Sequence, residues 1–141
     1  MGIEALRDLA GTWALTVDLP GAEDVRGQVV FEVLGEILVQ RITVPMPEAP
    51  DSCSVIVATE GGGYVQHYFD SRGVARLYAM TFDGRIWTLE RTTPDFSPLE
   101  FSQRFVGTIS DDRTAIKGEW RTSDDGQQWQ RDFGLTYTRV S

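Results

Sequence analysis

The sequence predicts an all-β fold, an antiparallel meander of about ten strands that forms one domain over residues 1–141. From Gly11 onward, short segments alternate apolar with polar residues and are separated by Gly, Pro and Asp. No helical periodicity lies between these segments, which is typical of a barrel or a two-sheet sandwich. A chain of 141 residues fits one domain and is long enough to bury a substantial core.

One short helix is expected before the first strand, because Ile3, Leu6 and Ala10 are spaced for one helical face. The alternating segments after it predict strands over residues 12–18, 25–34, 36–44, 53–59, 64–70, 74–82, 85–93, 101–109, 114–122 and 129–139. The two longest loops, proline-containing segments near residues 45–50 and 92–100, are expected at a rim of the barrel.

The turn between the sixth and seventh strands indicates which of their side chains share a face. Asp83-Gly84 is typical of a two-residue hairpin, because a type I′ turn needs positive φ at both central positions. Such a turn pairs Met80 with Trp87. The inner face of this hairpin is then expected to carry Tyr78, Met80, Trp87 and Leu89, with Arg76 and Arg91 further along it.

The C-terminal strands give a second, independent assignment of faces. A four-residue loop over 110–113 would pair Phe105 with Gly118 and Gln103 with Trp120. A turn over 123–128 extends the same face into the last strand. The inner residues expected there are Trp129, Arg131, Phe133, Leu135 and Tyr137.

The predicted inner surface is rich in aromatic rings and poor in polar groups, which is typical of a cavity for a small ligand. Gly107 and Gly118 remove side-chain volume from the same face. An inward arginine costs several kcal/mol unless an anion pairs with it. Arg131 and Gln103, on either side of Trp120, are therefore predicted to anchor an anionic or carbonyl-bearing ligand. Alternatively, Arg131 pairs with an inner glutamate or lies at the solvated rim.

Composition limits the classes of partner. Lys and Arg number 13 against 21 Asp and Glu, a net charge of −8, which disfavours nucleic acid and anionic membranes. No apolar run approaches the ~18 residues of a membrane span, and no signal peptide is visible. The single cysteine, Cys53, cannot form an internal disulfide. A cytoplasmic protein, monomeric or homodimeric, is expected.

Catalytic and metal-binding patterns are weak. His67 is the only histidine, and it faces outward if the turn over 70–73 closes a three-residue loop, or inward if the loop has four residues. A Cys53–His67 nucleophile pair lacks a group to orient the imidazole. The acidic pairs at 111–112 and 124–125 lie in turns, where Asp bonds to the local backbone. The sequence therefore assigns no catalytic residue, metal site or cofactor.

The opening segment Leu9-Ala10-Gly11-Thr12-Trp13, a helix followed by Gly-x-Trp, resembles the first motif of lipocalins and of the wider calycin group. The resemblance implies a calycin-like barrel in which the tryptophan closes the floor and Arg139, on the last strand, packs across it. The segments 68–73 and 129–137 are also similar to those of uncharacterised bacterial lipocalin-like proteins. That group implies a fold and a pocket rather than a reaction.

Two calycin branches depart from this sequence at their functional residues. Nitrobindin-like haem barrels ligate iron through a histidine late in the chain, and no histidine follows His67 here. Fatty-acid binding proteins carry Arg-x-Tyr on the last strand and a two-helix lid, whereas this chain has Tyr137-x-Arg139 and one predicted helix.

The leading hypothesis is non-covalent binding of a small, mostly apolar molecule, aromatic or carboxylate-bearing, inside the barrel. The expected ligand-binding residues are Tyr78, Met80, Trp87, Gln103, Phe105, Trp120, Arg131 and Phe133. One alternative is a cyclase or isomerase that uses Tyr68, Tyr78 or His67 as a proton donor. Another is a structural or interaction module whose barrel is filled by its own rings.

Overall fold

The computed structural model describes residues 2–18, 25–45 and 49–141. A short 3-10 helix, η1, covers Glu4–Leu9. Ten strands follow, β1 (Gly11–Asp18), β2 (Val25–Leu34), β3 (Ile37–Thr43), β4 (Ser52–Ala58), β5 (Tyr64–Asp70), β6 (Ala75–Phe82), β7 (Ile86–Arg91), β8 (Ser102–Ile109), β9 (Ala115–Ser123) and β10 (Gln130–Arg139). The all-β prediction is confirmed, and each expected strand is present with small differences at its ends.

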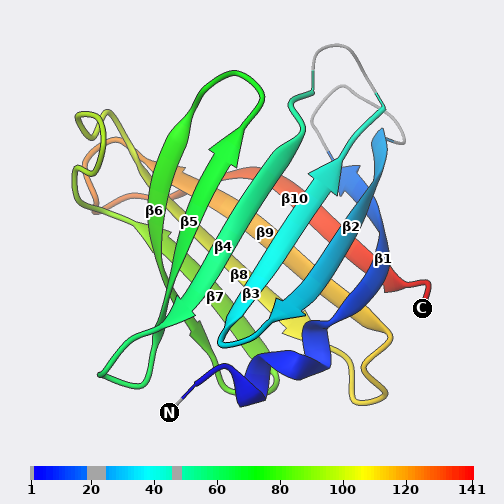
Figure 1. Cartoon of the computed structure of the whole chain (residues 1–141). Coiled ribbons are helices and arrows are strands. Elements are labelled where there is room, and N and C mark those ends of the chain that lie inside the picture. Colours follow the sequence, from blue (N-terminus) through cyan, green and yellow to red (C-terminus); the bar gives the residue numbers. More distant parts are fainter. Residues whose placement is uncertain (1, 19–24, 46–48) are drawn as a thin grey trace.

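The strands form one closed antiparallel barrel in which each strand pairs with its neighbours in sequence (Figure 1). Closure is made by β1 and β10, whose register runs from Trp13 opposite Arg139 to Asp18 opposite Gly134. The alternative of a two-sheet sandwich is thereby excluded. Among the described residues, no helix is long and apolar enough to cross a bilayer.

Helix η1 lies across one end of the barrel and packs its apolar side inward (Figure 1). Ile3, Leu6 and Leu9 are buried, a spacing of three that matches the eclipsed side chains of a 3-10 helix. The expected third position, Ala10, is wrong, because the helix ends before it in extended backbone. Below the helix, the indole N–H of Trp13 donates to the carbonyl of Leu9 over 2.9 Å.

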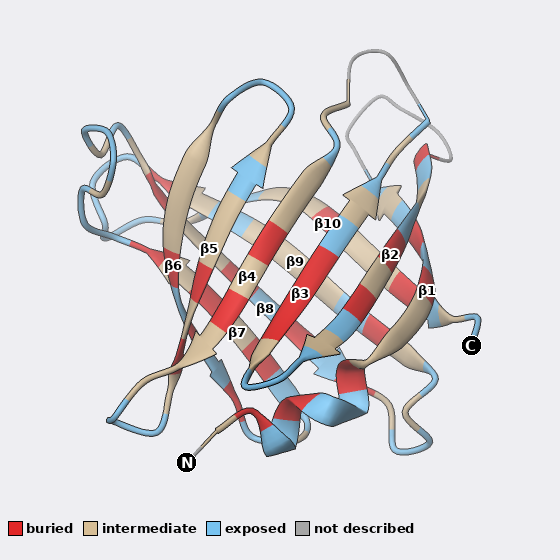
Figure 2. Ribbon diagram, viewed as in Figure 1, coloured by how far each residue is buried: buried red, intermediate tan, exposed pale blue. Residues whose placement is uncertain are grey.

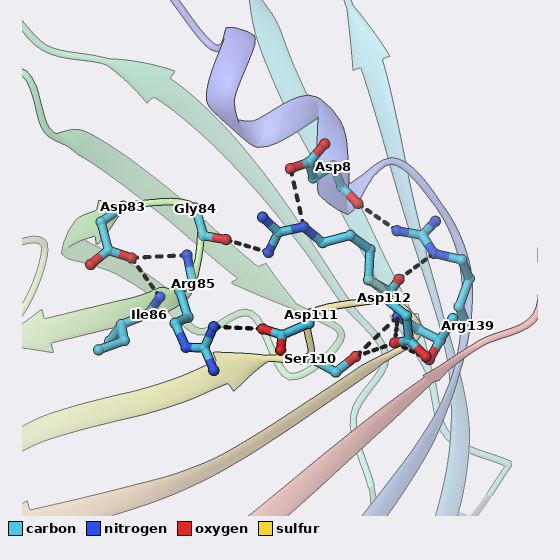
Figure 3. A network of polar contacts seen from close by, with 11 residues as sticks. Asp8, Asp83, Gly84, Arg85, Ile86, Ser110, Asp111, Asp112 and Arg139 are labelled. Carbon is cyan, nitrogen blue, oxygen red and sulfur yellow. Dashed lines mark hydrogen bonds and ion pairs between the residues drawn. The ribbon is translucent and has the colours of Figure 1, made fainter.

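Arg139 locks this end of the barrel. Its guanidinium lies 4.2 Å from the ring centroid of Trp13, as the lipocalin resemblance implies. The same group donates to the main-chain carbonyls of Ala10 and Arg113, each over 2.8 Å. It also donates to the main-chain carbonyl of Asp8 (Figure 3). One side chain of β10 thus holds two segments that are distant from it in sequence, residues 8–13 and the loop before β9.

Both predicted hairpin registers are wrong by two residues, and both assignments of faces survive. Phe82, not Met80, pairs with Trp87, because the Asp83 carboxylate accepts the N–H groups of Arg85 (2.9 Å) and Ile86 (2.6 Å) and stabilises a longer turn. Likewise, Phe105 on β8 pairs with Trp120 on β9, and not with Gly118 as expected. A shift of two keeps every side chain on its side of the sheet.

The burial pattern divides the barrel along its axis (Figure 2). The end near η1 is packed by buried apolar side chains: Ile3, Leu6, Leu9, Trp13, Val29, Phe31, Leu38, Ile56, Met80, Phe82, Ile109 and Ile116. Tyr78, Trp87, Leu89, Phe105 and Tyr137 are also buried, but they border open space. The barrel is therefore packed at one end and hollow at the other. Residues 46–48 of the predicted loop near the hollow end lie outside the described residues.

Candidate ligand-binding cavity

A cavity of about 220 Å³ occupies the barrel interior on the side away from η1. Every strand except β2 contributes to its wall. The lining residues are Leu15, Val17, Gln40, Ile42, Pro50, Ser52, Gln66, Tyr68, Arg76, Tyr78, Trp87, Leu89, Gln103, Phe105, Trp120, Phe133, Leu135 and Tyr137. An apolar cavity of ~150 Å³ can hold benzene, so this one has room for a single substituted ring.

Aromatic rings form a continuous wall along one side of the cavity. Phe105 lies 5.0 Å from Trp87 and 5.3 Å from Trp120, measured between ring centroids. Trp120 in turn lies 5.5 Å from Tyr78, edge to face. A flat apolar ligand would meet ring faces and edges here, the geometry in which aromatic pairs attract.

The polar part of the wall is centred on Gln103. Its side-chain carbonyl accepts a hydrogen bond from Arg76 Nη1 over 3.2 Å and one from the Tyr78 hydroxyl over 3.1 Å. These two contacts hold the guanidinium against the cavity. The remaining N–H groups of Arg76 and the amide N–H groups of Gln103 are donors suited to an anion.

Arg76 and Arg91 lie on adjacent strands but have opposite surroundings. Arg91 is buried and forms a two-pronged ion pair with Asp95, at 2.8 and 2.9 Å. Hydrogen bonds from Arg91 hold the pKa of Asp95 well below its usual range. Arg76 is half-buried, and none of the ion pairs among the described residues includes it. Arg76 is thus a cation of the cavity wall without a carboxylate.

The phenols of the cavity are not tuned for proton transfer. Burial raises the pKa of Tyr78 and of Tyr137, so both stay protonated near neutral pH. Burial also raises the pKa of Tyr68, as does its hydrogen bond to Asp70, 2.8 Å long. General acids work best with a pKa near the operating pH, and these phenols are shifted away from it.

Six of the eight predicted site residues line the cavity: Tyr78, Trp87, Gln103, Phe105, Trp120 and Phe133. Met80 faces inward as expected, but it packs into the filled end near η1 and does not border the cavity. The inward orientation expected for Arg131 is wrong. Its side chain is exposed and pairs with Asp18 (2.8 Å) and Glu119 (2.6 Å) on the outer surface.

A β-bulge explains the error at Arg131. The register of β10 against β9 shifts between Arg131, opposite Arg121, and Phe133, opposite Trp120. The extra residue inverts the alternation, so the odd-numbered residues of the last strand face inward after the bulge and outward before it. Trp129, also expected inside, instead lies outside with the Arg104 guanidinium 4.1 Å from its ring centroid.

Gly107 and Gly118 do not clear space for a ligand, as the sequence suggested. The ring of Phe105 lies over both of them. A Cβ built on Gly118 would stand 2.4 Å from Phe105 Cζ, and one on Gly107 would stand 2.9 Å from the same atom. The glycines therefore seat a ring of the cavity wall.

His67 and Cys53 stay outside the cavity. The turn after β5 has three residues between Asp70 and Val74, so Gln66 and Tyr68 face inward and His67 faces outward. With no imidazole in the wall and room for one substituted ring, the cavity does not fit an axially ligated haem. No cluster of potential metal ligands occurs among the described residues.

The sequence placed Arg76 on the inner face but did not identify it as the anchor. The facing of Gln66 was left undecided, because it depends on the same choice of loop length as that of His67. The signal for Gln66 was the length of the 71–73 loop, which fixes the facing of the whole strand. The alternation does not distinguish Arg76 from Arg91, because the two differ in their partners. Arg91 is paired with the carboxylate of Asp95, which lies in a loop.

A closed ten-strand antiparallel barrel with this register fits a calycin-like fold. The chain is similar in structure to Rv2717c from M. tuberculosis, with a TM-score of 0.66 and 16% sequence identity over 99% of this chain and 97% of that one. At this identity the likeness shows the fold alone. No family model and no curated protein matches the sequence.

Proposed function

We propose that the barrel binds a small, mostly apolar molecule, a one-ring carboxylate in particular, without covalent chemistry. The observation that carries this proposal is Arg76, a guanidinium in an aromatic cavity with no acidic partner among the described residues. A half-buried charge of this kind is stabilised when an anion pairs with it. The ring of such a ligand would pack against Phe105, Trp120 and Phe133.

The size of the cavity supports one ring rather than a long acyl chain or a macrocycle, because about 220 Å³ only modestly exceeds the volume that takes benzene. The same void favours binding over a barrel filled by its own side chains. The pKa values of Tyr68 and Tyr78 are raised away from neutrality and His67 faces outward, so no observation favours the cyclase or isomerase alternative.

Three further expectations stay predictions. The Gly11-Thr12-Trp13 motif with Arg139 across the indole supports kinship with lipocalins in particular. The single cysteine is in keeping with a cytoplasmic location, and the acidic composition disfavours nucleic-acid partners. The protein is expected to be a monomer or a homodimer.

The test is calorimetric titration of benzoate and of benzyl alcohol, a neutral molecule of similar size, into the wild type, Arg76→Gln and Arg131→Gln. Arg131 is the matched control, an arginine of the outer surface with two carboxylate partners. Hydrogen bonds to charged groups contribute about 1.5–3 kcal/mol, so Arg76→Gln should weaken benzoate binding roughly 10-fold to 100-fold.

Benzyl alcohol should bind the wild type and Arg76→Gln alike, and Arg131→Gln should bind benzoate as the wild type does. The proposal is wrong if benzoate does not bind the wild type, or if Arg76→Gln binds it with unchanged affinity.

A further inference from the structure

Two residues that line the cavity each have a buried polar atom with no hydrogen-bond partner among the described residues, Gln66 Oε1 and Trp87 Nε1. The two residues are 4% and 2% exposed, so bulk water does not reach them freely. A buried polar group without a partner is costly and uncommon in folded proteins. Both residues line the cavity in which the proposed ligand would lie, and this points to a partner supplied by the ligand.

Gln66 lies beside the polar side of the cavity. It stands opposite Tyr78 in the register of β5 and β6, and the Tyr78 hydroxyl bonds to Gln103. The Gln66 amide is half used, because its Nε2 donates to Ser54 Oγ over 3.3 Å while Oε1 has no partner. If the amide is turned over, its nitrogen becomes the unpaired end, so either orientation leaves one hydrogen-bonding position open.

Trp87 lies deeper, toward η1. It stands on β7 four residues before Arg91, opposite Phe82, which belongs to the packed end. Aromatic rings surround its indole, with Phe31, Phe105 and Tyr137 centred 6.0, 5.0 and 5.8 Å away. An indole N–H can only donate, and these neighbours have not satisfied it.

We propose that the ligand is a hydroxylated aromatic acid, whose ring hydroxyl bonds to Trp87 Nε1–H or to the free end of the Gln66 amide. A hydroxyl is the smallest substituent that both donates and accepts, so it satisfies either group in either amide orientation. This inference rests on the proposed function, since it adds a ring substituent to a ligand whose carboxylate is held by Arg76.

The experiment compares ligands that differ only in this substituent. Hydroxybenzoates with the hydroxyl at ring position 2, 3 or 4 are titrated by calorimetry, each against the methylbenzoate with a methyl group at the same position. Hydroxyl and methyl are close in size, so the ratio of affinities reports hydrogen bonding. A site built to bond a hydroxyl discriminates strongly against a ligand without one, because its own polar group is then left unpaired.

At one ring position or more, the hydroxy acid should bind the wild type at least about tenfold tighter than its methyl counterpart. Trp87→Phe, which removes the N–H and keeps a ring, and Gln66→Met, which keeps the chain length, are then compared. In at least one of the two variants the ratio should fall below about twofold. Because the ratio is taken within each variant, a general loss of affinity or stability cancels.

Two results would overturn the inference alone. In the first, every methylbenzoate binds the wild type as tightly as the matching hydroxybenzoate. In the second, the preference for hydroxyl persists unchanged in both variants. If benzoate, the methylbenzoates and the hydroxybenzoates all fail to bind the wild type, the proposed function fails, and this inference fails with it.

Discussion

Replacing Gly118 by alanine tests whether the Phe105 ring is seated on the glycines of β8 and β9 as the structure places it. An added Cβ would stand 2.4 Å from Phe105 Cζ and 2.5 Å from Cε1. Gly118 is not among the glycines with positive φ, so its backbone accepts alanine without strain. The substitution therefore acts mainly on this ring, and the next atom that the added Cβ would approach is Gly107 Cα, at 3.1 Å.

The expected cost follows from that overlap. Carbon atoms pack best at about 3.5–4.0 Å, so the ring must move away from the added Cβ by about 1 Å. Overpacking of this kind costs about 1–3 kcal/mol, against about 0.4–1 kcal/mol gained from the stiffer unfolded chain. Gly118→Ala should therefore lose about 1–2 kcal/mol of stability. It should also change benzoate binding, because Phe105 lines the cavity.

The assay is urea unfolding of the wild type, Gly118→Ala, Phe105→Leu and the double variant, analysed as a double-mutant cycle. Leucine lacks the ring atoms that meet the new Cβ. In the Phe105→Leu background, alanine at position 118 should thus cost clearly less, because only the close approach to Gly107 Cα remains. Equal losses in the two backgrounds, or a stabilised single variant Gly118→Ala, would contradict the seating of the ring.

The remaining predictions concern the contacts of Arg91, which is buried, and of Arg139, which is half-buried. Asp95→Asn should cost about 3 kcal/mol in urea unfolding at pH 7, because Arg91 is left buried without its carboxylate. Since Arg91 lowers the pKa of Asp95, this difference should be complete above the unfolded pKa of about 4 and should shrink as the pH falls below it; a pH-independent difference would contradict the pairing. Arg139→Ala should lower stability by about 2 kcal/mol in thermal unfolding, since it loses the stack on Trp13 and three main-chain acceptors. The control Arg121→Ala, at an exposed arginine of the barrel wall, should stay within about 0.5 kcal/mol of the wild type.

The faces of the strands could be predicted from the sequence because alternation has a period of two. The expected pairing of Met80 with Trp87 is replaced by that of Phe82 with Trp87, yet all three residues still point inward. The turn length was wrong because Asp83 accepts local N–H groups with its side chain, a preference that a turn template does not include. An error of two residues in register leaves the predicted faces unchanged, whereas an error of one residue inverts them.

The bulge in β10 causes such a one-residue error in the predicted register. It lies between Arg131 and Phe133 and moves the arginine from the predicted inner face to the surface. Nothing in the local alternation marks it, because Arg131 and Trp129 fit the inner pattern of polar anchor and aromatic wall equally well. The contacts that favour the outward position come from Asp18 on β1 and Glu119 on β9, which are known only once the barrel has closed.

The identity of the anchor depends in the same way on a contact outside the strands. Asp95 lies in the proline-containing loop after β7. Its carboxylate accepts hydrogen bonds from the Arg91 guanidinium and from the backbone N–H of Leu77. It thereby neutralises one of two inward arginines and ties the loop to β6, while Arg76 keeps its charge facing the cavity. Had that carboxylate reached Arg76 instead, the same strands and the same rings would enclose a cavity with no cation of its own. The preference for an acid that we propose would therefore be set by the position of one loop residue, Asp95, while the barrel supplies the shape of the cavity.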